Sequence, residues 1–186
     1  MTVGFAMCGS FCTYDRIFPV IEALSKIHSV IPILSQTAYE TDCRFGTAGA
    51  RLQRLEAICG IPPLHLVTQV EPIGPKCLLD ALIIAPCTGN TLAKLAYSIA
   101  DSSVTMAANS QLRNARPVVI AVSTNDGLAG AAENIGRLFA RKHCYFVPFG
   151  QDDPVRKPTS LVADFSKIPQ TLEAALGGRQ LQPLLL

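Results

Sequence analysis

The sequence is poor in charge and has no long run of any one residue type. Asp, Glu, Lys and Arg make up 16% of its 186 residues, well below the quarter that is usual in soluble domains. So little charge predicts that part of the surface is covered in a homo-oligomer. The formal net charge is only +2 and no Lys/Arg-rich run is present, which excludes the electrostatic footprint of a nucleic-acid-binding protein.

The cysteines and the apolar runs exclude further classes. Seven cysteines, an odd number scattered along the chain, give no disulfide framework. Cys8 and Cys12 form a C-x3-C pair, but no second pair or His tandem completes a metal site. We therefore expect reduced thiols and no bound metal. No basic segment precedes an apolar stretch at the N-terminus, and no apolar run reaches the roughly 20 residues of a membrane helix. A cytoplasmic protein is expected.

Short apolar runs alternate with segments of helical periodicity, as in a parallel sheet built from βαβ units. The predicted strands cover residues 2–7, 30–34, 64–67, 81–85, 116–122 and 144–147. The predicted helices cover residues 16–27, 49–59, 88–99, 103–112 and 130–142. Segment 81–85 (ALIIA) is apolar throughout, which indicates a central strand that Pro86 ends.

These elements predict an α/β fold with three layers, in which a Rossmann-like open parallel sheet of about six strands carries helices on both faces. Residues 1–150 are expected to form this domain. Residues 151–186 are expected to form a C-terminal arm that packs on the same domain and carries a short helix near 169–176.

Small residues with hydroxyl or amide groups follow four of the predicted strands. They are Gly9, Ser10 and Thr13; Ser35 and Thr37; Thr88, Gly89, Asn90 and Thr91; and Ser123, Thr124 and Asn125. The carboxyl ends of parallel strands meet at one edge of a sheet, where ligands bind. Glycine permits close backbone approach, and helix N-termini attract phosphate. The alternative is that these residues are ordinary caps and turns.

The loops together predict a phosphate-bearing ligand. A mononucleotide is favoured over a dinucleotide because no G-x-G-x-x-G follows the first strand, and because Ser35, rather than an acidic residue, follows the second.

Two of these loops resemble the family of homo-oligomeric flavin-containing Cys decarboxylases. They are segments 9–14 (GSFCTY) and 85–96 (APCTGNTLAKLA). The second loop reads Pro-Ala-Ser-Ala-Asn-Thr in that family, so that Pro86, Asn90 and Thr91 match in place. Thr88 replaces the serine, and Cys87 and Gly89 are substitutions. Segments 108–128 and 145–164 resemble in particular the branch of this family formed by dipicolinate synthase B subunits.

The resemblance implies a flavoprotein-like fold, FMN as cofactor and a trimer-based assembly. It implies that Gly9, Ser10, Thr13, Ser35 and Thr37 contact the flavin phosphate and ribityl chain. Pro86, Thr88, Asn90 and Thr91 would form the loop beside the phosphate and the isoalloxazine ring. Asn125 would stand where the decarboxylases bind a substrate carboxylate.

Cys decarboxylation itself is not expected. The decarboxylases carry a catalytic histidine shortly before the fourth strand, where this chain reads EPIGPK at 71–76. Their Met- and Trp-bearing substrate clamp is also missing, because segment 123–128 reads STNDGL and the chain has no tryptophan. His28 and His143 are interpreted as structural, and His65, in the predicted third strand, is the one histidine that could face the site.

The resemblance to the B subunits implies a different activity. Together with an A subunit, the chain would oxidise a dihydrodipicolinate-type precursor to dipicolinic acid in the mother cell of a spore-forming bacterium. A flavin could accept the hydride, or the partner could bring NAD(P). The candidate cations for the dicarboxylate are Lys76, Lys94, Arg113 and Arg116, and the candidate acid–base groups are Asp126, Asp152 and Asp153. The alternatives are a flavin-free scaffold or regulatory subunit and a flavin-dependent decarboxylase.

Overall fold

Five parallel strands form the core of the sheet in the computed structural model, which describes residues 1–186. Their order is β2-β1-β3-β4-β5. The strands are β1 (Thr2–Met7), β2 (Ser29–Leu34), β3 (Ala81–Cys87), β4 (Val118–Thr124) and β5 (Cys144–Phe146). Every residue of β3 is buried, as expected of a strand covered on both faces.

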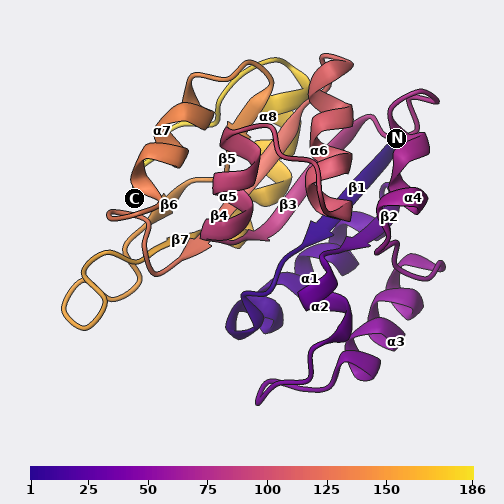
Figure 1. Ribbon diagram of the computed structural model, residues 1–186, viewed down its shortest axis with the longest axis horizontal. Helices are drawn as coiled ribbons and strands as arrows, with labels where there is room; N and C mark the ends of the chain where they lie inside the picture. The colour runs from indigo at the N-terminus through magenta and orange to yellow at the C-terminus, as the bar shows by residue number, and fades with distance from the viewer.

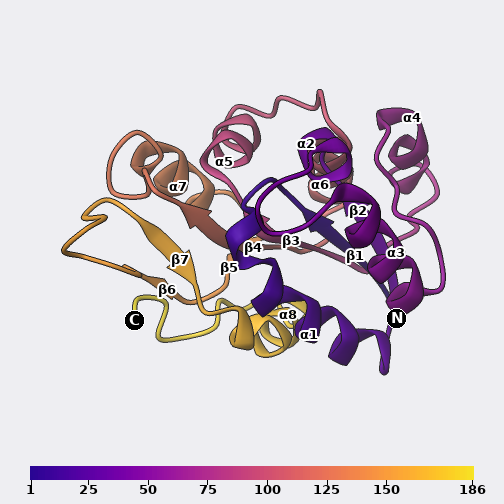
Figure 2. The same ribbon diagram turned by 90° about the horizontal axis from the view of Figure 1, so that it is seen from below.

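Helices cover both faces of the sheet, so the predicted three-layer fold is confirmed. Figure 2 shows α1 (Tyr14–Ser25) and α8 (Ile168–Leu176) below the sheet. Above it lie α5 (Gly89–Ala96), α6 (Ser103–Arg113) and α7 (Ala132–Phe139). α1 buries one apolar side, which includes Ile17, Ile21 and Leu24 at helical spacing. The remaining helices are α2 (Gln36–Glu40), α3 (Ala48–Cys59) and α4 (Val67–Val70).

A short antiparallel hairpin extends the sheet at the carboxyl ends of its parallel strands (Figure 1). It consists of β6 (Phe149–Gly150) and β7 (Leu161–Ala163), and β7 pairs with Ser123 and Thr124 at the carboxyl end of β4. β5 pairs only with the first half of β4. The predicted arm is therefore built into the sheet, and the division of the chain at residue 150 stays a prediction.

The predicted strand at 64–67 is wrong. Only Leu64 pairs with β2, opposite Ile33, and α4 begins at Val67. The physical reason is the side chain of Gln69, whose carbonyl oxygen accepts from the backbone N–H groups of His65 and Leu66. In a strand, these N–H groups would donate to a neighbouring strand. Here they are bonded to the side chain of Gln69, which favours the start of a helix instead.

Pro86 does not end the third strand of the core, contrary to the prediction, because β3 continues to Cys87. A proline lacks the N–H that a ladder needs. The pairing between β3 and β4 is irregular between Ile84 and Cys87, and this irregularity accommodates the proline. The carbonyl of Pro86 still accepts from the N–H of Cys8 at 3.2 Å, which joins the ends of β1 and β3.

Candidate functional site: two cavities at the carboxyl edge of the sheet

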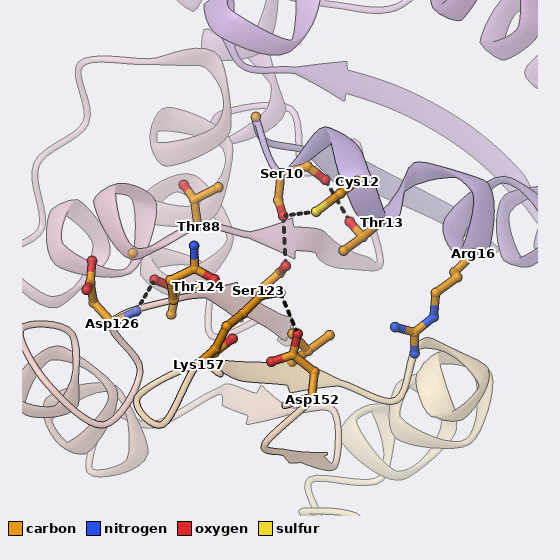
Figure 3. A pocket seen from close by; sticks show the side chains of 15 residues that line it. Ser10, Cys12, Thr13, Arg16, Thr88, Ser123, Thr124, Asp126, Asp152 and Lys157 are labelled. Atoms are coloured by element: carbon orange, nitrogen blue, oxygen red, sulfur yellow. Dashed lines mark hydrogen bonds and ion pairs between the residues drawn. The ribbon is translucent and has the colours of Figure 1, made fainter. Parts of the chain in front are cut away.

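Two neighbouring cavities lie at the carboxyl ends of the strands, and they share Gly9 and Thr88 in their walls. The first, here called the β4-side cavity, has a volume of about 490 Å³ (Figure 3). Its wall comprises Gly9, Ser10, Cys12, Thr13, Arg16, Thr88, Gly89, Ser123, Thr124, Asn125, Asp126, Asp152, Lys157, Ser160 and Val162. Both cavities have the size of small-molecule sites.

The second, here called the β2-side cavity, has a volume of about 430 Å³. Its wall comprises Cys8, Gly9, Ser35, Gln36, Thr37, Thr88, Asn90, Thr91, Lys94, Asp101 and Ser102. All predicted cofactor- and substrate-binding residues except Pro86 thus line one or both cavities. Pro86 is buried within β3 and faces neither cavity.

The loop after β1 is fixed by hydrogen bonds that leave its small side chains at the cavity. The Thr13 hydroxyl donates to the carbonyl of Ser10 at 2.8 Å, so it does not cap α1. The hydroxyl oxygens of Ser10 and Ser123 lie 2.8 Å apart. The Tyr14 hydroxyl donates to the carbonyl of Cys8 at 2.8 Å from beneath the loop. The two sides of the β4-side cavity are therefore bonded to each other.

The walls of the β2-side cavity are also held by short polar contacts. Ser35 caps α2, because its hydroxyl accepts from the N–H of Ala38 at 3.2 Å. The hydroxyls of Thr88 and Thr91 lie 3.2 Å apart, and Thr91 also donates to the sulfur of Cys8 at 3.2 Å. Burial raises the pKa of the Cys8 thiol to about 11, so this group is an uncharged acceptor in the cavity wall.

The cavities fit a ligand of the flavin mononucleotide type in three respects. A Cβ at Gly9 would lie 3.0 Å from the Thr37 methyl, a tight contact, so glycine lets the backbone line the cavity there without displacing Thr37. Thr88 makes no side-chain bond to the first amides of α5, which leaves that helix end open to acceptor atoms. The Ser160 hydroxyl in the β4-side cavity is buried without a hydrogen-bond partner.

Four of the six charged residues that line the cavities form two ion pairs, and Asp126 and Arg16 form none. Lys94 is bonded to both carboxylate oxygens of Asp101, at 2.9 and 2.8 Å, at the mouth of the β2-side cavity. In the β4-side cavity, Lys157 pairs with Asp152 at 3.2 Å. The Ser160 hydroxyl beside Asp152, outside hydrogen-bond geometry, and the Lys157 ammonium lower the pKa of Asp152 below its usual range. Arg16 forms no ion pair.

Several residues that the sequence suggested lie elsewhere. Arg116 pairs with Asp80 at 3.5 Å. Asp80 immediately precedes β3, so this ion pair lies at the amino edge of the sheet. Arg113 and Lys76 lie near the same edge, at the end of α6 and in the loop before β3. His65 stacks on Tyr39 with ring centroids 3.6 Å apart and lines neither cavity. Of the acid–base candidates, Asp126 and Asp152 line the β4-side cavity and Asp153 does not.

The sequence did not reveal five residues of the β4-side cavity: Cys12, Arg16, Lys157, Ser160 and Val162. Arg16 stands in the first turn of the helix that follows the β1 loop, and that position was a usable signal. Lys157 and Ser160 reach the cavity because β7 pairs with β4, which no local pattern indicates. No three His, Cys, Asp or Glu side chains gather closely enough to hold a metal ion. No helix is both long and apolar enough to cross a membrane.

A flavin-type site on an open parallel sheet agrees with the relatives of this chain. Residues 1–134 match the Flavoprotein family, and the chain therefore belongs to that family. It is 44% identical to the dipicolinate synthase B subunit of Bacillus subtilis (strain 168) over 185 residues, which cover 99% of this chain and 92% of that protein. This identity places it among the dipicolinate synthase B subunits.

Solved structures agree. The crystal structure of the dipicolinate synthase B subunit from Bacillus halodurans C superposes with a TM-score of 0.91 at 44% identity, covering 100% of this chain and 95% of that one. Burkholderia xenovorans DmrB in complex with FMN, described as a cubic protein cage for redox transfer, has a TM-score of 0.71 at 18% identity, covering 95% of each chain. The second likeness concerns the fold alone.

Proposed function

We propose that this chain is the flavin-binding B subunit of a dipicolinate synthase. Together with an A subunit, it takes part in removing two hydrogens from a dihydrodipicolinate-type precursor, in the mother cell of a spore-forming bacterium. One observation carries the proposal: the loops after β1, β2, β3 and β4 converge on two neighbouring cavities that share Gly9 and Thr88 in their walls. The family of the chain and the FMN bound in DmrB support the choice of ligand.

The proposed role of each residue follows from the cavity that it lines. Gly9, Ser35 and Thr37 in the β2-side cavity, with the open end of α5, are the proposed phosphate and ribityl contacts. Asn90 and Thr91 lie along the same wall and offer an amide and a hydroxyl to the ring. Asn125, in the β4-side cavity, is the proposed contact of a substrate carboxylate. A bound flavin supplies a two-electron acceptor, and a nicotinamide cofactor on the A subunit is the second possible acceptor.

The flavin proposal is tested on the purified full-length chain. FMN should bind, give the solution the visible absorption of a protein-bound flavin, and raise the melting temperature, because a ligand of the native state stabilises it. Asn90→Ala should weaken FMN binding roughly 5- to 10-fold, the effect of one lost hydrogen bond. The matched control is Gln53→Ala, an exposed amide on α3 outside both cavities. A chain that neither binds FMN nor gains stability from it is a scaffold or regulatory subunit instead.

The catalytic proposal needs the partner. Dipicolinate formation from the precursor is followed for the chain alone, for the A subunit alone, and for the mixture. Product from the mixture only is the expected result. Omitting FMN and NAD(P) in turn then identifies the electron acceptor, and formation of the product by the A subunit alone at the full rate would remove this chain from catalysis.

A further inference from the structure

The β4-side cavity contains two cationic side chains that come from distant parts of the chain. Arg16 belongs to the first turn of α1, and Lys157 belongs to the loop between β6 and β7. Figure 3 shows them entering the cavity from opposite sides, with Asp152 between them in that view. Thr159 holds the hairpin loop in place, because its hydroxyl donates to the carbonyl of Asn125 at 2.6 Å. This bond fixes the β6–β7 loop to the loop after β4.

Arg16 is available to a ligand. Its guanidinium carbon lies 5.0 Å from the centre of the Phe165 ring, and it has no carboxylate partner. The aromatic face orients the guanidinium and leaves its N–H donors free. The other cation at the rim, Lys94, is already bonded to both oxygens of Asp101.

Lys157 can bind a ligand by exchanging its present ion-pair partner for a group of the ligand. Its partner Asp152 is a single carboxylate 3.2 Å away at the protein surface, and such a pair contributes little to stability. The Ser160 hydroxyl is buried in the same wall beside Asp152 and makes no hydrogen bond of standard geometry. The cavity also contains the carboxylate of Asp126. The formal charge of the cavity is thus zero, and of its two carboxylates only that of Asp152 is paired with a cation of the cavity.

We propose that Arg16 and Lys157 each bind one carboxylate of a small ring dicarboxylate in the β4-side cavity, and that Ser160 donates a further hydrogen bond. This inference rests on the proposed function, since it names the groups that recognise that substrate class. When the ligand binds, Lys157 exchanges its ion pair with Asp152 for one with a ligand carboxylate. This exchange is favourable because two carboxylates on one ring form charge-assisted hydrogen bonds with Arg16 and Lys157 at the same time. Asp152 then competes with the ligand for Lys157. Removing the charge of Asp152 should therefore strengthen ligand binding, whereas removing the charge of Arg16 or Lys157 should weaken it.

The test is calorimetric titration of the full-length chain with dipicolinate, in the presence and absence of FMN. Arg16→Gln and Lys157→Gln should each weaken dipicolinate binding about tenfold or more, the effect of a lost charge-assisted hydrogen bond. Asp152→Asn should tighten it several-fold. Picolinate, which has one carboxylate, should bind more weakly to the parent chain and be insensitive to at least one of the two cation variants. Lys26→Gln, an exposed lysine at the far end of α1, is the control and should change nothing.

The outcomes separate the two proposals. Dipicolinate binding that responds to these variants without any FMN binding supports this inference and overturns the flavin proposal. FMN binding with no dipicolinate binding, or with binding that none of the three variants changes, overturns the inference alone. Weaker binding by Asp152→Asn also overturns it, because a competing carboxylate cannot contribute to the affinity. Circular dichroism and FMN affinity of each variant show whether the variant is folded.

Discussion

The hydroxyl oxygens of Ser10 and Ser123 lie 2.8 Å apart although 113 residues separate them in the sequence. Ser10 lies in the loop after β1, Ser123 is the last residue but one of β4, and β3 lies between these two strands in the sheet. The contact therefore closes over the end of β3, beside the Thr88 that both cavities share. In the β4-side cavity, the contact joins the segment after β1, which leads to Arg16, to the end of β4, which pairs with the hairpin.

Removing this contact should reveal a coupling between the two serines. In a double-mutant cycle of Ser10→Ala and Ser123→Ala, the coupling free energy should be about 0.5–1.5 kcal/mol, because one partly buried hydrogen bond is lost. Urea unfolding of the four proteins measures it. A second cycle of Ser10→Ala with Ser29→Ala, an exposed serine at the start of β2, should show no coupling. Equal coupling in both cycles would mean that the contact contributes nothing.

Gly9 should be needed for the ligand more than for the fold. In Gly9→Ala the new Cβ lies within 3.0 Å of the Thr37 methyl, so the loop or Thr37 must move and FMN binding should fall by tenfold or more. Thr37→Ser removes that methyl and keeps the hydroxyl. The double variant Gly9→Ala/Thr37→Ser should therefore regain part of the lost affinity, as measured by FMN titration. A Gly9→Ala protein with unchanged FMN affinity would remove this loop from the site.

Gln180 should stabilise the exposed edge of the sheet. Its carboxamide accepts from the N–H of Phe146 at 2.7 Å and donates to the carbonyl of Phe146 at 2.6 Å, as a neighbouring strand would. Gln180→Ala should lower the free energy of unfolding by about 1–3 kcal/mol, because both backbone groups lose their partner. Gln170→Ala, an exposed residue of α8, should change it by less than about 0.5 kcal/mol. Chemical denaturation decides, and equal effects at the two positions would contradict the expected role of Gln180.

Stability should decrease at alkaline pH, and Cys8 should contribute to the decrease. Burial raises the pKa of its thiol from 9.0 to about 11 in the folded chain. Between these values the unfolded chain loses the proton while the folded chain keeps it, so the free energy of unfolding falls as pH rises. Cys59 and Cys144 share this direction, because burial also raises their pKa to about 11.

The variant Cys8→Ala should make this fall less steep, by at most about 1.4 kcal/mol per pH unit between pH 9 and 11. Urea unfolding at pH 8, 9 and 10 measures the slope. Ser103→Ala, which removes a buried hydroxyl that does not titrate in this range, should leave the slope unchanged whatever its effect on stability. A Cys8→Ala slope identical to that of the parent would show that Cys8 does not couple folding to pH.

Local pattern by itself determined the parallel sheet and most of the residues that line the two cavities. The apolar run of β3 and the strand–helix alternation predict a doubly covered sheet, and parallel strands bring their carboxyl ends to one edge whatever the loops contain. Gly9, Ser35, Asn90 and Asn125 were therefore predictable as neighbours before any coordinates. The segment at 64–67 was not predictable as a helix start, because a single side chain, Gln69, takes its amides from the ladder.

Only the tertiary structure decided which charged groups stand in the site. Nothing in the sequence around Arg116 or Lys157 tells which of these two cations belongs to the site. In the structure, Arg116 pairs with Asp80 at the amino edge of the sheet, whereas Lys157 lines the β4-side cavity. The difference arises because β7 pairs antiparallel with the last two residues of β4 and brings the 151–160 loop back to the rim. Such a pairing between distant segments leaves no periodic signal in either one, so the sequence specifies it only through the packed structure.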